Sequence, residues 1–260
     1  MARKRRDTRL PAPFLKRLTL IADRMGDRKT YPMSLPWCDP ERFEIAFETP
    51  VTIIVGENGS GKSTLIEAVA ALAGYDEAGG GKGYRPVDHS RALDKSGAAL
   101  GDAMRGAWLP KVTDGWFFRA ESFFSVARYL DQTAMEVGGA PPDFLSWSHG
   151  EGFVRFFEER MARQGLYMMD EPESALSPNR QLELLRLLAR LQNTATAQVI
   201  MATHSPILMA VPGATVLEMT RFGPEPVAYQ HTAHFRLYAS FVADPVGFVE
   251  AALAEEAIHD

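Results

Sequence analysis

The sequence predicts an α/β fold with a largely parallel sheet flanked by helices. Short, unbroken apolar segments recur at 51–55, 166–169 and 197–203, as in strands that are covered on both faces. Segments with apolar residues at helical spacing separate these strands. The alternation favours a parallel sheet, because a helix commonly joins one parallel strand to the next.

The first half of the chain contains the clearest strand and helix. A short strand is expected at 44–47, ahead of the buried strand at 51–55. The helix that follows should begin at about Gly61 and end near Gly74, because glycine suits the left-handed position after a helix.

The middle of the chain gives weaker signals. Periodicity is lost between residues 75 and 115, where the glycine-rich segment 79–83 predicts an exposed, flexible loop. A strand at 116–120 and a helix at 122–130 are expected next. Glycines and prolines at 138–142 then interrupt the pattern.

The second half returns to clear alternation. The segment 152–163 predicts an amphipathic helix whose aromatic residues Phe153, Phe156 and Phe157 belong to the core. Ser177 and Pro178 predict a helix start, with the serine as the cap and the proline at the first helical position. The other elements expected are a strand at 166–169, an apolar helix over 181–191, a strand at 197–203, a hairpin of 214–219 with 226–230, and a last helix opened by Asp244 and Pro245.

The length and composition fit one large domain. A chain of 260 residues with 46% hydrophobic content can build a sizeable core. We therefore predict a single domain over 1–260, with an inserted helical lobe at about 75–150. Residues 1–12 are predicted to be a flexible, basic N-terminus.

Charge and cysteine usage restrict the classes of function. A formal net charge of −5 argues against a wholly basic surface that wraps nucleic acid, although the run from Met1 to Arg9 is basic. No segment approaches the ~20 apolar residues of a membrane-spanning helix, so direct membrane insertion is not expected. The single Cys38 cannot form an internal disulfide and is expected to be inert. We expect a cytoplasmic protein.

A glycine-rich turn between the buried strand at 51–55 and the next helix matches the phosphate-binding-loop pattern in full. Its glycines let the backbone approach phosphates closely, and the N-terminus of the helix adds partial positive charge. Lys62 should reach the β- and γ-phosphates, and the hydroxyl of Ser63 should bind Mg²⁺. The residues expected to contact the nucleotide are Gly56, Glu57, Asn58, Gly59, Ser60, Gly61, Lys62, Ser63 and Thr64.

Two polar groups follow two of the buried strands. Asp170 and Glu171 come directly after the strand at 166–169, at the edge where open α/β sheets bind ligands. Asp170 should hold the Mg²⁺ through water, and Glu171 should polarise the attacking water. His204 follows the strand at 197–203 and is a candidate sensor of the γ-phosphate, donating a hydrogen bond to developing charge.

These elements, in this order, resemble the ATP-binding cassette (ABC) class of phosphate-loop (P-loop) ATPases over most of the chain. In that class a signature segment lies about twenty residues before the acidic pair, and the segment 145–152 occupies that place here. The resemblance implies that Ser148 and Gly150 close over the γ-phosphate of an ATP bound by a second subunit. Two ATP molecules would then be sandwiched in a head-to-tail homodimer, and ATP itself is implied by the resemblance.

The signature departs from that of transporters. The segment 148–151, Ser-His-Gly-Glu, is closer to small soluble ATPases similar to the overcoming-lysogenization-defect, recombination and structural-maintenance-of-chromosomes groups. Glu173 agrees, because transporters usually have threonine there. The segment 174–177 resembles the loop that crosses the dimer interface, but Ser177 stands where many relatives have Asp or His, which leaves that role open.

Two further family positions stay open. The glutamine that these ATPases place after a middle strand corresponds either to Glu121, a carboxylate that could hold the metal but would repel the γ-phosphate, or to Gln132, which lies past a predicted helix. The aromatic residue that stacks on adenine could be Phe14, Tyr31 or Trp37, and packing in the core explains each of them as well.

The leading hypothesis is an ATPase whose dimer closes on ATP and drives or gates an unknown protein partner. The energy subunit of an ABC transporter is the first alternative. A nucleic-acid maintenance or phage-defence ATPase is the second, using the basic N-terminus with Arg85, Arg91 and Lys95. A scaffold that binds ATP without hydrolysing it is disfavoured by Glu171.

Overall fold

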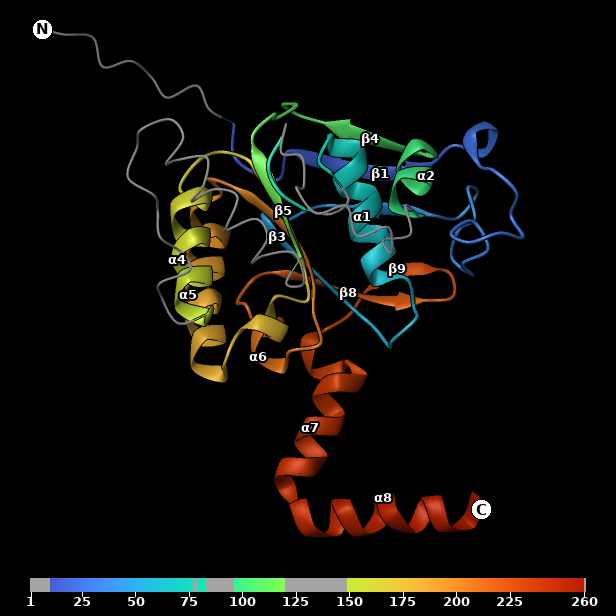
Figure 1. Ribbon diagram of the computed structural model, residues 1–260, viewed down its shortest axis with the longest axis vertical. Helices are drawn as coiled ribbons and strands as arrows, with labels where there is room; N and C mark the ends of the chain where they lie inside the picture. The colour runs from blue at the N-terminus through green and yellow to red at the C-terminus, as the bar shows by residue number, and fades with distance from the viewer. Residues whose placement is uncertain (1–9, 77–78, 83–95, 120–148, 260) are drawn as a thin grey trace, which may run out of the picture.

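The computed structural model describes residues 10–76, 79–82, 96–119 and 149–259 (Figure 1). Its main element is a six-stranded sheet in which the first five strands of the spatial order are parallel and the last is antiparallel. The spatial order is β5 (Gly115–Arg119), β6 (Leu166–Asp170), β7 (Gln198–Ala202), β3 (Val51–Val55), β8 (Thr215–Thr220) and β9 (Gly223–Pro226). The predicted α/β fold with a largely parallel sheet is confirmed.

A second, three-stranded antiparallel sheet lies beside the first. It consists of β2 (Glu44–Ala46), β1 (Leu15–Leu20) and β4 (Met104–Trp108) in that spatial order. The sequence predicted β2 but neither β1 nor β4. Charged residues at the exposed positions of β1 and a glycine within β4 weaken the apolar pattern of these strands.

The chain between residues 75 and 115 is more regular than its sequence predicts, because α2 (Ser96–Asp102) and β4 both form there. Gly80 also pairs with Phe117 of β5, its amide lying 2.8 Å from the Phe117 carbonyl oxygen. Tertiary contacts thus build structure where the local pattern is weak. The predicted inserted lobe stays a prediction, since residues 83–95 and 120–148 lie outside the described part of the chain.

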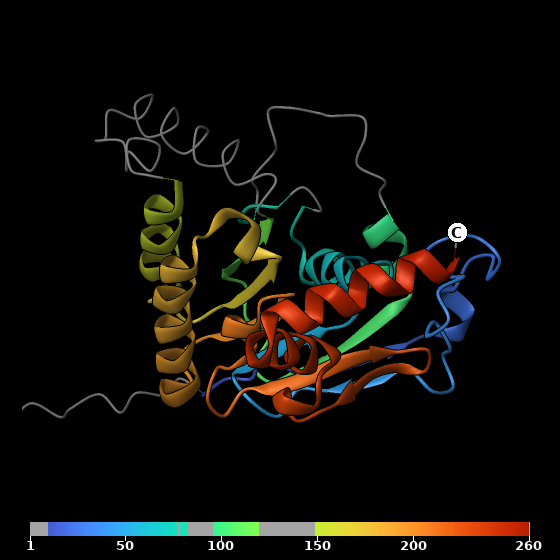
Figure 2. The same ribbon diagram turned by 90° about the horizontal axis from the view of Figure 1, so that it is seen from below.

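Helices cover both faces of the six-stranded sheet (Figure 2). α1 (Lys62–Ala73) and α2 share one core with the antiparallel sheet, while α4 (His149–Met161), α5 (Pro178–Thr194) and α6 (Pro206–Met209) form the other. Alternate residues of each strand divide between the two cores, as with Ile53 and Ile54 of β3. The predicted aromatic residues Phe153, Phe156 and Phe157 are fully buried in the second core.

The start of α5 differs in one detail from its prediction. Pro178 fills the first helical position as expected, but the Ser177 side chain makes no capping hydrogen bond. The carbonyl oxygen of Ser177 instead accepts from the Gln181 amide at 2.9 Å. Ser177 therefore marks the helix start through its extended backbone and not through its hydroxyl.

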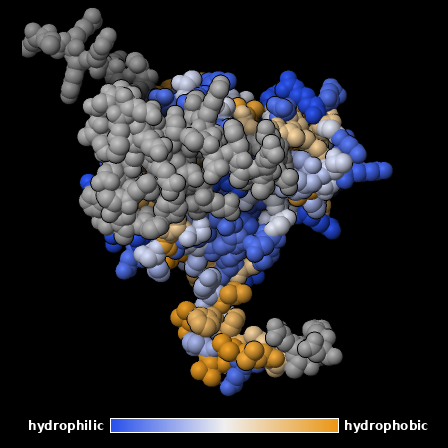
Figure 3. Space-filling view, in the orientation of Figure 1, coloured by the Kyte–Doolittle hydropathy of each residue, from blue (hydrophilic) through white to orange (hydrophobic). Residues whose placement is uncertain are grey.

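The C-terminal part forms an arm that extends from the body (Figure 1). The hairpin of β8 and β9 is present, with its second strand earlier than predicted because Tyr229–His231 form a short 3-10 helix, η3. α7 (Ala233–Ala243), which the sequence did not predict, and α8 (Pro245–His259) follow. Apolar residues are exposed along both helices (Figure 3). Among the described helices none alone is long and apolar enough to cross a membrane, and only α7 combined with 245–254, bent by 114°, meets the length and composition required.

Candidate functional site

The P-loop joins β3 to α1 in the conformation that its glycines permit. Gly56, Gly59 and Gly61 all have positive φ angles, of 149°, 76° and 89°. At Gly61 a Cβ atom would lie 2.9 Å from Nε1 of Trp37, so a side chain has no room there. The backbone at both ends of the turn therefore depends on glycine, as the motif predicts.

Trp37 fixes the outer side of this loop. Its indole Nε1 donates a hydrogen bond to the Ser60 carbonyl oxygen at 2.9 Å, and its ring stacks on Phe43 at a centroid distance of 5.3 Å. Trp37 and Phe14 are both buried, which removes them as candidates for stacking on adenine. Tyr31 is 56% exposed, and its hydroxyl is hydrogen-bonded to Oγ1 of Thr64. Of the three aromatic candidates, Tyr31 is thus the one that is accessible beside the loop.

Lys62 lies across the P-loop. Its Nζ donates to the carbonyl oxygens of Gly56 at 2.7 Å and Glu57 at 2.9 Å. Burial lowers the pKa of the ammonium group, while the nearby carboxylates of Glu171 and Asp170 act in the opposite direction. The lysine charge is thereby held at the centre of the loop, where it can turn from these carbonyls to a phosphate.

The acidic strand end lies beside the P-loop, as predicted. Asp170 is the last residue of β6, and its Oδ1 accepts a hydrogen bond from Oγ of Ser63 at 3.1 Å. One strand, β7, separates β6 from β3 in the sheet, so both carboxyl ends point to the same edge. The segments 56–64 and 170–171, far apart in the sequence, therefore form one site.

The oxygens of Ser63 and Asp170 suit Mg²⁺. This hard cation prefers oxygen ligands and is commonly held by one or two protein groups together with phosphate oxygens and water. The described residues contain no cluster of three or more His, Cys, Asp or Glu side chains that could hold a metal ion alone. A metal that depends on bound phosphate for its remaining ligands fits this donor set.

Glu171 has a strained backbone. Its φ of 45° and ψ of 54° place it in the left-handed region, just before the 3-10 helix η2 (Pro172–Ala175). The amide of Glu171 donates to the Ala202 carbonyl oxygen at 3.0 Å, which ties the turn to β7. Such outliers concentrate at functional sites, where the surrounding structure enforces them. Here the turn directs a partly exposed carboxylate beside Asp170.

His204 lies beside Glu171, its Nε2 at 3.5 Å from Oε1 of that carboxylate. The amide of His204 donates to Oε1 of Glu173 at 2.5 Å. Glu173, which stands where transporters usually have threonine, therefore holds the backbone of the histidine in place. Burial raises the pKa of the Glu173 carboxyl, and the hydrogen bond from His204 opposes this. The P-loop, the acidic pair and the predicted phosphate sensor thus converge.

A second histidine, which sequence reasoning missed, completes this group. His234 is the second residue of α7, and its Nε2 lies 2.8 Å from Nδ1 of His204. We call His204 and His234 the histidine pair. Burial is the main cause that lowers the pKa of each ring, followed by the charge of Lys62 for His204 and by His204 for His234. No local motif marks His234, because it lies 30 residues beyond His204 on the arm.

Several predicted residues cannot be placed. Ser148, Glu121 and Gln132 lie outside the described residues, as do Arg85, Arg91 and Lys95. Gly150 lies in the first turn of α4. Their roles stay predictions.

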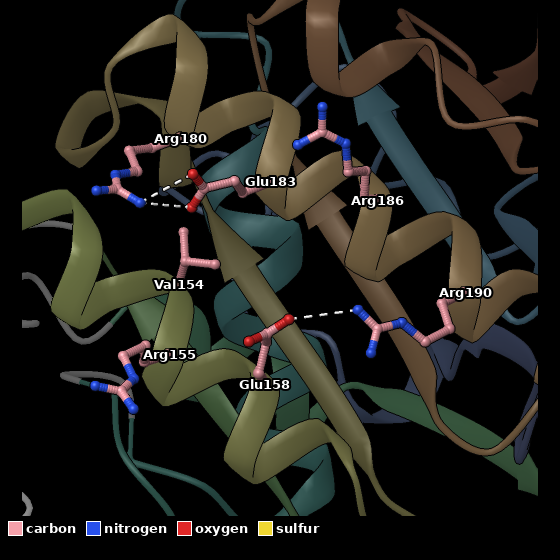
Figure 4. A pocket seen from close by; sticks show the side chains of 7 residues that line it. All are labelled: Val154, Arg155, Glu158, Arg180, Glu183, Arg186 and Arg190. Atoms are coloured by element: carbon pink, nitrogen blue, oxygen red, sulfur yellow. Dashed lines mark hydrogen bonds and ion pairs between the residues drawn. The ribbon is translucent and has the colours of Figure 1, made fainter.

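A separate hollow lies between α4 and α5 (Figure 4). Its charged residues form ion pairs, from Arg180 to Glu183 within α5 at 2.8 Å and from Arg190 to Glu158 between the helices at 3.3 Å. The two helices belong to the core opposite α1. The ion pair from Arg190 to Glu158 therefore links α4 to α5, and the hollow is distinct from the P-loop site.

The fold and the site together define a P-loop nucleotide-binding protein. Two family descriptions match parts of the chain: "AAA domain" over residues 33–100, and "AAA domain, putative AbiEii toxin, Type IV TA system" over residues 152–210. The first match contains the P-loop, and the second contains the acidic pair and His204.

Curated relatives are ATP-binding proteins. The molybdenum import ATP-binding protein ModC 1 of Azotobacter vinelandii is 26% identical in an alignment of 237 residues that covers 80% of this chain and 62% of that protein. The ModC protein of Mesorhizobium japonicum is 29% identical over 177 residues, covering 63% of this chain and 47% of that protein. The chain thus spans between about half and three fifths of the length of these two relatives. Among solved structures, the SMC head domain from Thermotoga maritima aligns with a TM-score of 0.43 at 16% identity, over 83% of this chain and 98% of that one.

The chain is therefore similar to P-loop ATP-binding proteins. The predicted class rests on the P-loop, the acidic pair Asp170 and Glu171, and His204, and the two family matches cover all three.

Proposed function

We propose that the chain binds Mg²⁺-ATP between the P-loop and the end of β6, and hydrolyses the nucleotide there. The hydrogen bond from Ser63 to Asp170 carries this proposal, because it brings the two expected metal-binding oxygens within 3.1 Å of each other. The buried ammonium of Lys62 supplies positive charge at the same place.

Each residue of the site has a separate role in the proposed phosphoryl transfer. Amides of the P-loop and the N-terminus of α1 bind phosphate oxygens, and Lys62 adds a full charge. Glu171 accepts a proton as a water molecule attacks the γ-phosphorus and the bond to the leaving ADP oxygen breaks. His204 donates from Nε2 to the charge that develops on the γ-phosphate. Mg²⁺, held by Ser63 and Asp170, would neutralise phosphate charge.

The state of His204 supports its role. Its Nε2 is buried without a hydrogen-bond partner among the described residues, an arrangement that costs free energy until an acceptor arrives. A γ-phosphate oxygen is such an acceptor. The same atom lies 3.5 Å from Glu171, so the sensor and the proton acceptor would serve one reaction centre.

We further propose that ATP closes two copies into a head-to-tail dimer, in which Ser148 and Gly150 of one copy meet the nucleotide of the other. The support is the position of the signature segment before β6, together with Gly150 in the first turn of α4. Closure and reopening would drive or gate a protein partner.

A transporter energy subunit is the second candidate. It is favoured by the similarity to import ATP-binding proteins over 80% of the chain. Copurification with a membrane-spanning protein would support it. ATP turnover that rises with added duplex DNA and not with such a partner would favour the nucleic-acid alternative.

The test measures ATP turnover and mass in solution with Mg²⁺ and ATP, for the wild type and for Glu171→Gln. We expect the variant to lose turnover, keep ATP binding and accumulate as a dimer. Glu48→Gln is the matched control, because Glu48 is exposed outside the site. Normal turnover by Glu171→Gln would remove Glu171 from its role, and a monomer with ATP bound would contradict the dimer.

A further inference from the structure

The side chain of His234 brings the arm formed by α7 and α8 into contact with His204 of the proposed ATP site. His234 lies in the first turn of α7, whose start is fixed by the buried Thr232. Oγ1 of Thr232 accepts from the Phe235 amide at 3.2 Å and donates to the Tyr229 carbonyl oxygen at 2.8 Å. The ring of Phe235 packs against Tyr229 at a centroid distance of 4.8 Å. The first turn of α7 is therefore anchored, although large apolar residues farther along the described part of the arm, such as Val242 and Leu253, are exposed.

The histidine pair shares one hydrogen bond, with two arrangements of its proton. The rings lie 5.0 Å apart at an angle of 60°. In one arrangement Nδ1 of His204 donates to Nε2 of His234. In the other, Nε2 of His234 donates to Nδ1 of His204.

The surroundings distinguish the two arrangements. If His204 donated through Nδ1, the lone pair of its Nε2 would face the Glu171 carboxylate at 3.5 Å. The other ring atom, Nδ1 of His234, would then be an N–H group that is buried without a described acceptor. If His234 donates instead, Nε2 of His204 is an N–H group at 3.5 Å from Oε1 of Glu171, and Nδ1 of His234 carries a lone pair that needs no acceptor. Neither atom forms a hydrogen bond within the described residues, but this second arrangement turns an N–H group toward the carboxylate and leaves no buried N–H group on His234, so it is the favoured one.

We propose that His234 is a positioning residue, which donates from Nε2 to His204 and so holds His204 with its proton on Nε2. His204 is then oriented to donate to a γ-phosphate, and the first turn of α7 becomes part of the ATPase site. The inference rests on the proposed role of His204. A hydrogen bond to one ring nitrogen commonly sets the tautomer and orientation of a histidine in this way.

The decisive measurement is the tautomer of His204 in the free protein. Long-range ¹H–¹⁵N spectra of histidine-labelled protein distinguish a proton on Nε2 from one on Nδ1, and His204→Gln identifies the signal. We expect His204 to carry its proton on Nε2 in the wild type, and to become a mixture of tautomers in His234→Leu. A proton on Nδ1 of His204 in the wild type would overturn the proposal.

Kinetics give the functional half of the test. We expect His234→Leu to lower kcat by about ten- to a hundredfold with little change in KM, the usual effect of losing a residue that orients an active-site histidine. His234→Gln keeps an N–H donor at similar reach and should restore most of kcat. His231→Leu is the control, because His231 is exposed on η3. An unchanged kcat in His234→Leu would refute the positioning role.

The two proposals can fail separately. A wild type without ATPase activity would refute the proposed function, yet the tautomer of His204 would still be readable. Should His234→Leu not fold, the wild-type tautomer and the turnover of His234→Gln decide the question.

Discussion

Replacing Lys62 with methionine tests how the P-loop binds phosphate. Methionine keeps most of the aliphatic stem but removes the ammonium group, which donates to the Gly56 and Glu57 carbonyl oxygens. On binding ATP, the wild-type lysine exchanges these acceptors for charged phosphate oxygens. A hydrogen bond between charged groups makes a net contribution of about 1.5–3 kcal/mol. The net loss of about 1.5–3 kcal/mol predicts ATP binding that is about 10- to 150-fold weaker.

The assay is calorimetric titration of Mg²⁺-ATP into each protein. The variant should still fold, with an unfolding free energy lowered by about 1 kcal/mol because two carbonyl groups lose a donor. Lys16→Met is the matched control, since Lys16 is exposed on β1. Equal affinity of Lys62→Met and the wild type for ATP would refute the assignment of the loop.

Three other outcomes follow from the structure. Gly115→Ala should destabilise the fold by about 3 kcal/mol or more in denaturant titrations, because the φ of Gly115 is 147° and a Cβ atom there would lie 1.8 Å from the Leu166 carbonyl oxygen. Gly26→Ala is the control and should be close to neutral, because no atom lies within 4 Å of the added Cβ. Trp37→Phe should lower the unfolding free energy by about 1–2 kcal/mol and weaken ATP binding, because Ser60 loses its indole donor; unchanged stability would contradict this. The lowered pKa values of the histidine pair mean that the unfolded state takes up more protons below about pH 6.5, so the melting temperature should fall on acidification from pH 7 to pH 5.5. Replacing both histidines with glutamine should reduce that fall, and an identical fall would contradict it.

The sequence was sufficient to predict the elements whose signals are local. The P-loop, β3 and α1 follow one another in the chain, so pattern and context reinforce each other. The placement of Asp170 at the end of β6 followed from the rule for open α/β sheets, and the Ser63 hydrogen bond confirms it.

The sequence failed mainly to predict elements that form through contacts between distant segments. β1 pairs with β4 across about ninety residues, and neither strand has a clear alternating pattern. α7 exposes Leu237, Tyr238, Phe241 and Val242, which recur at helical spacing on one side of the helix, so its local pattern was present and was overlooked. His234 could not be found from any local pattern, because its role depends on where α7 meets His204.

The central claim is that Ser63 and Asp170 hold one metal ion beside the phosphates. A double-mutant cycle with Ser63→Ala and Asp170→Asn tests it, by titrating Mg²⁺-ATP into the wild type, both single variants and the double variant. We predict strong non-additivity: once either variant has lost the metal contact, the second change should cost little, with a coupling of about 1 kcal/mol or more. Fully additive losses, like those of Ser63→Ala combined with the distant Glu48→Gln, would contradict the account.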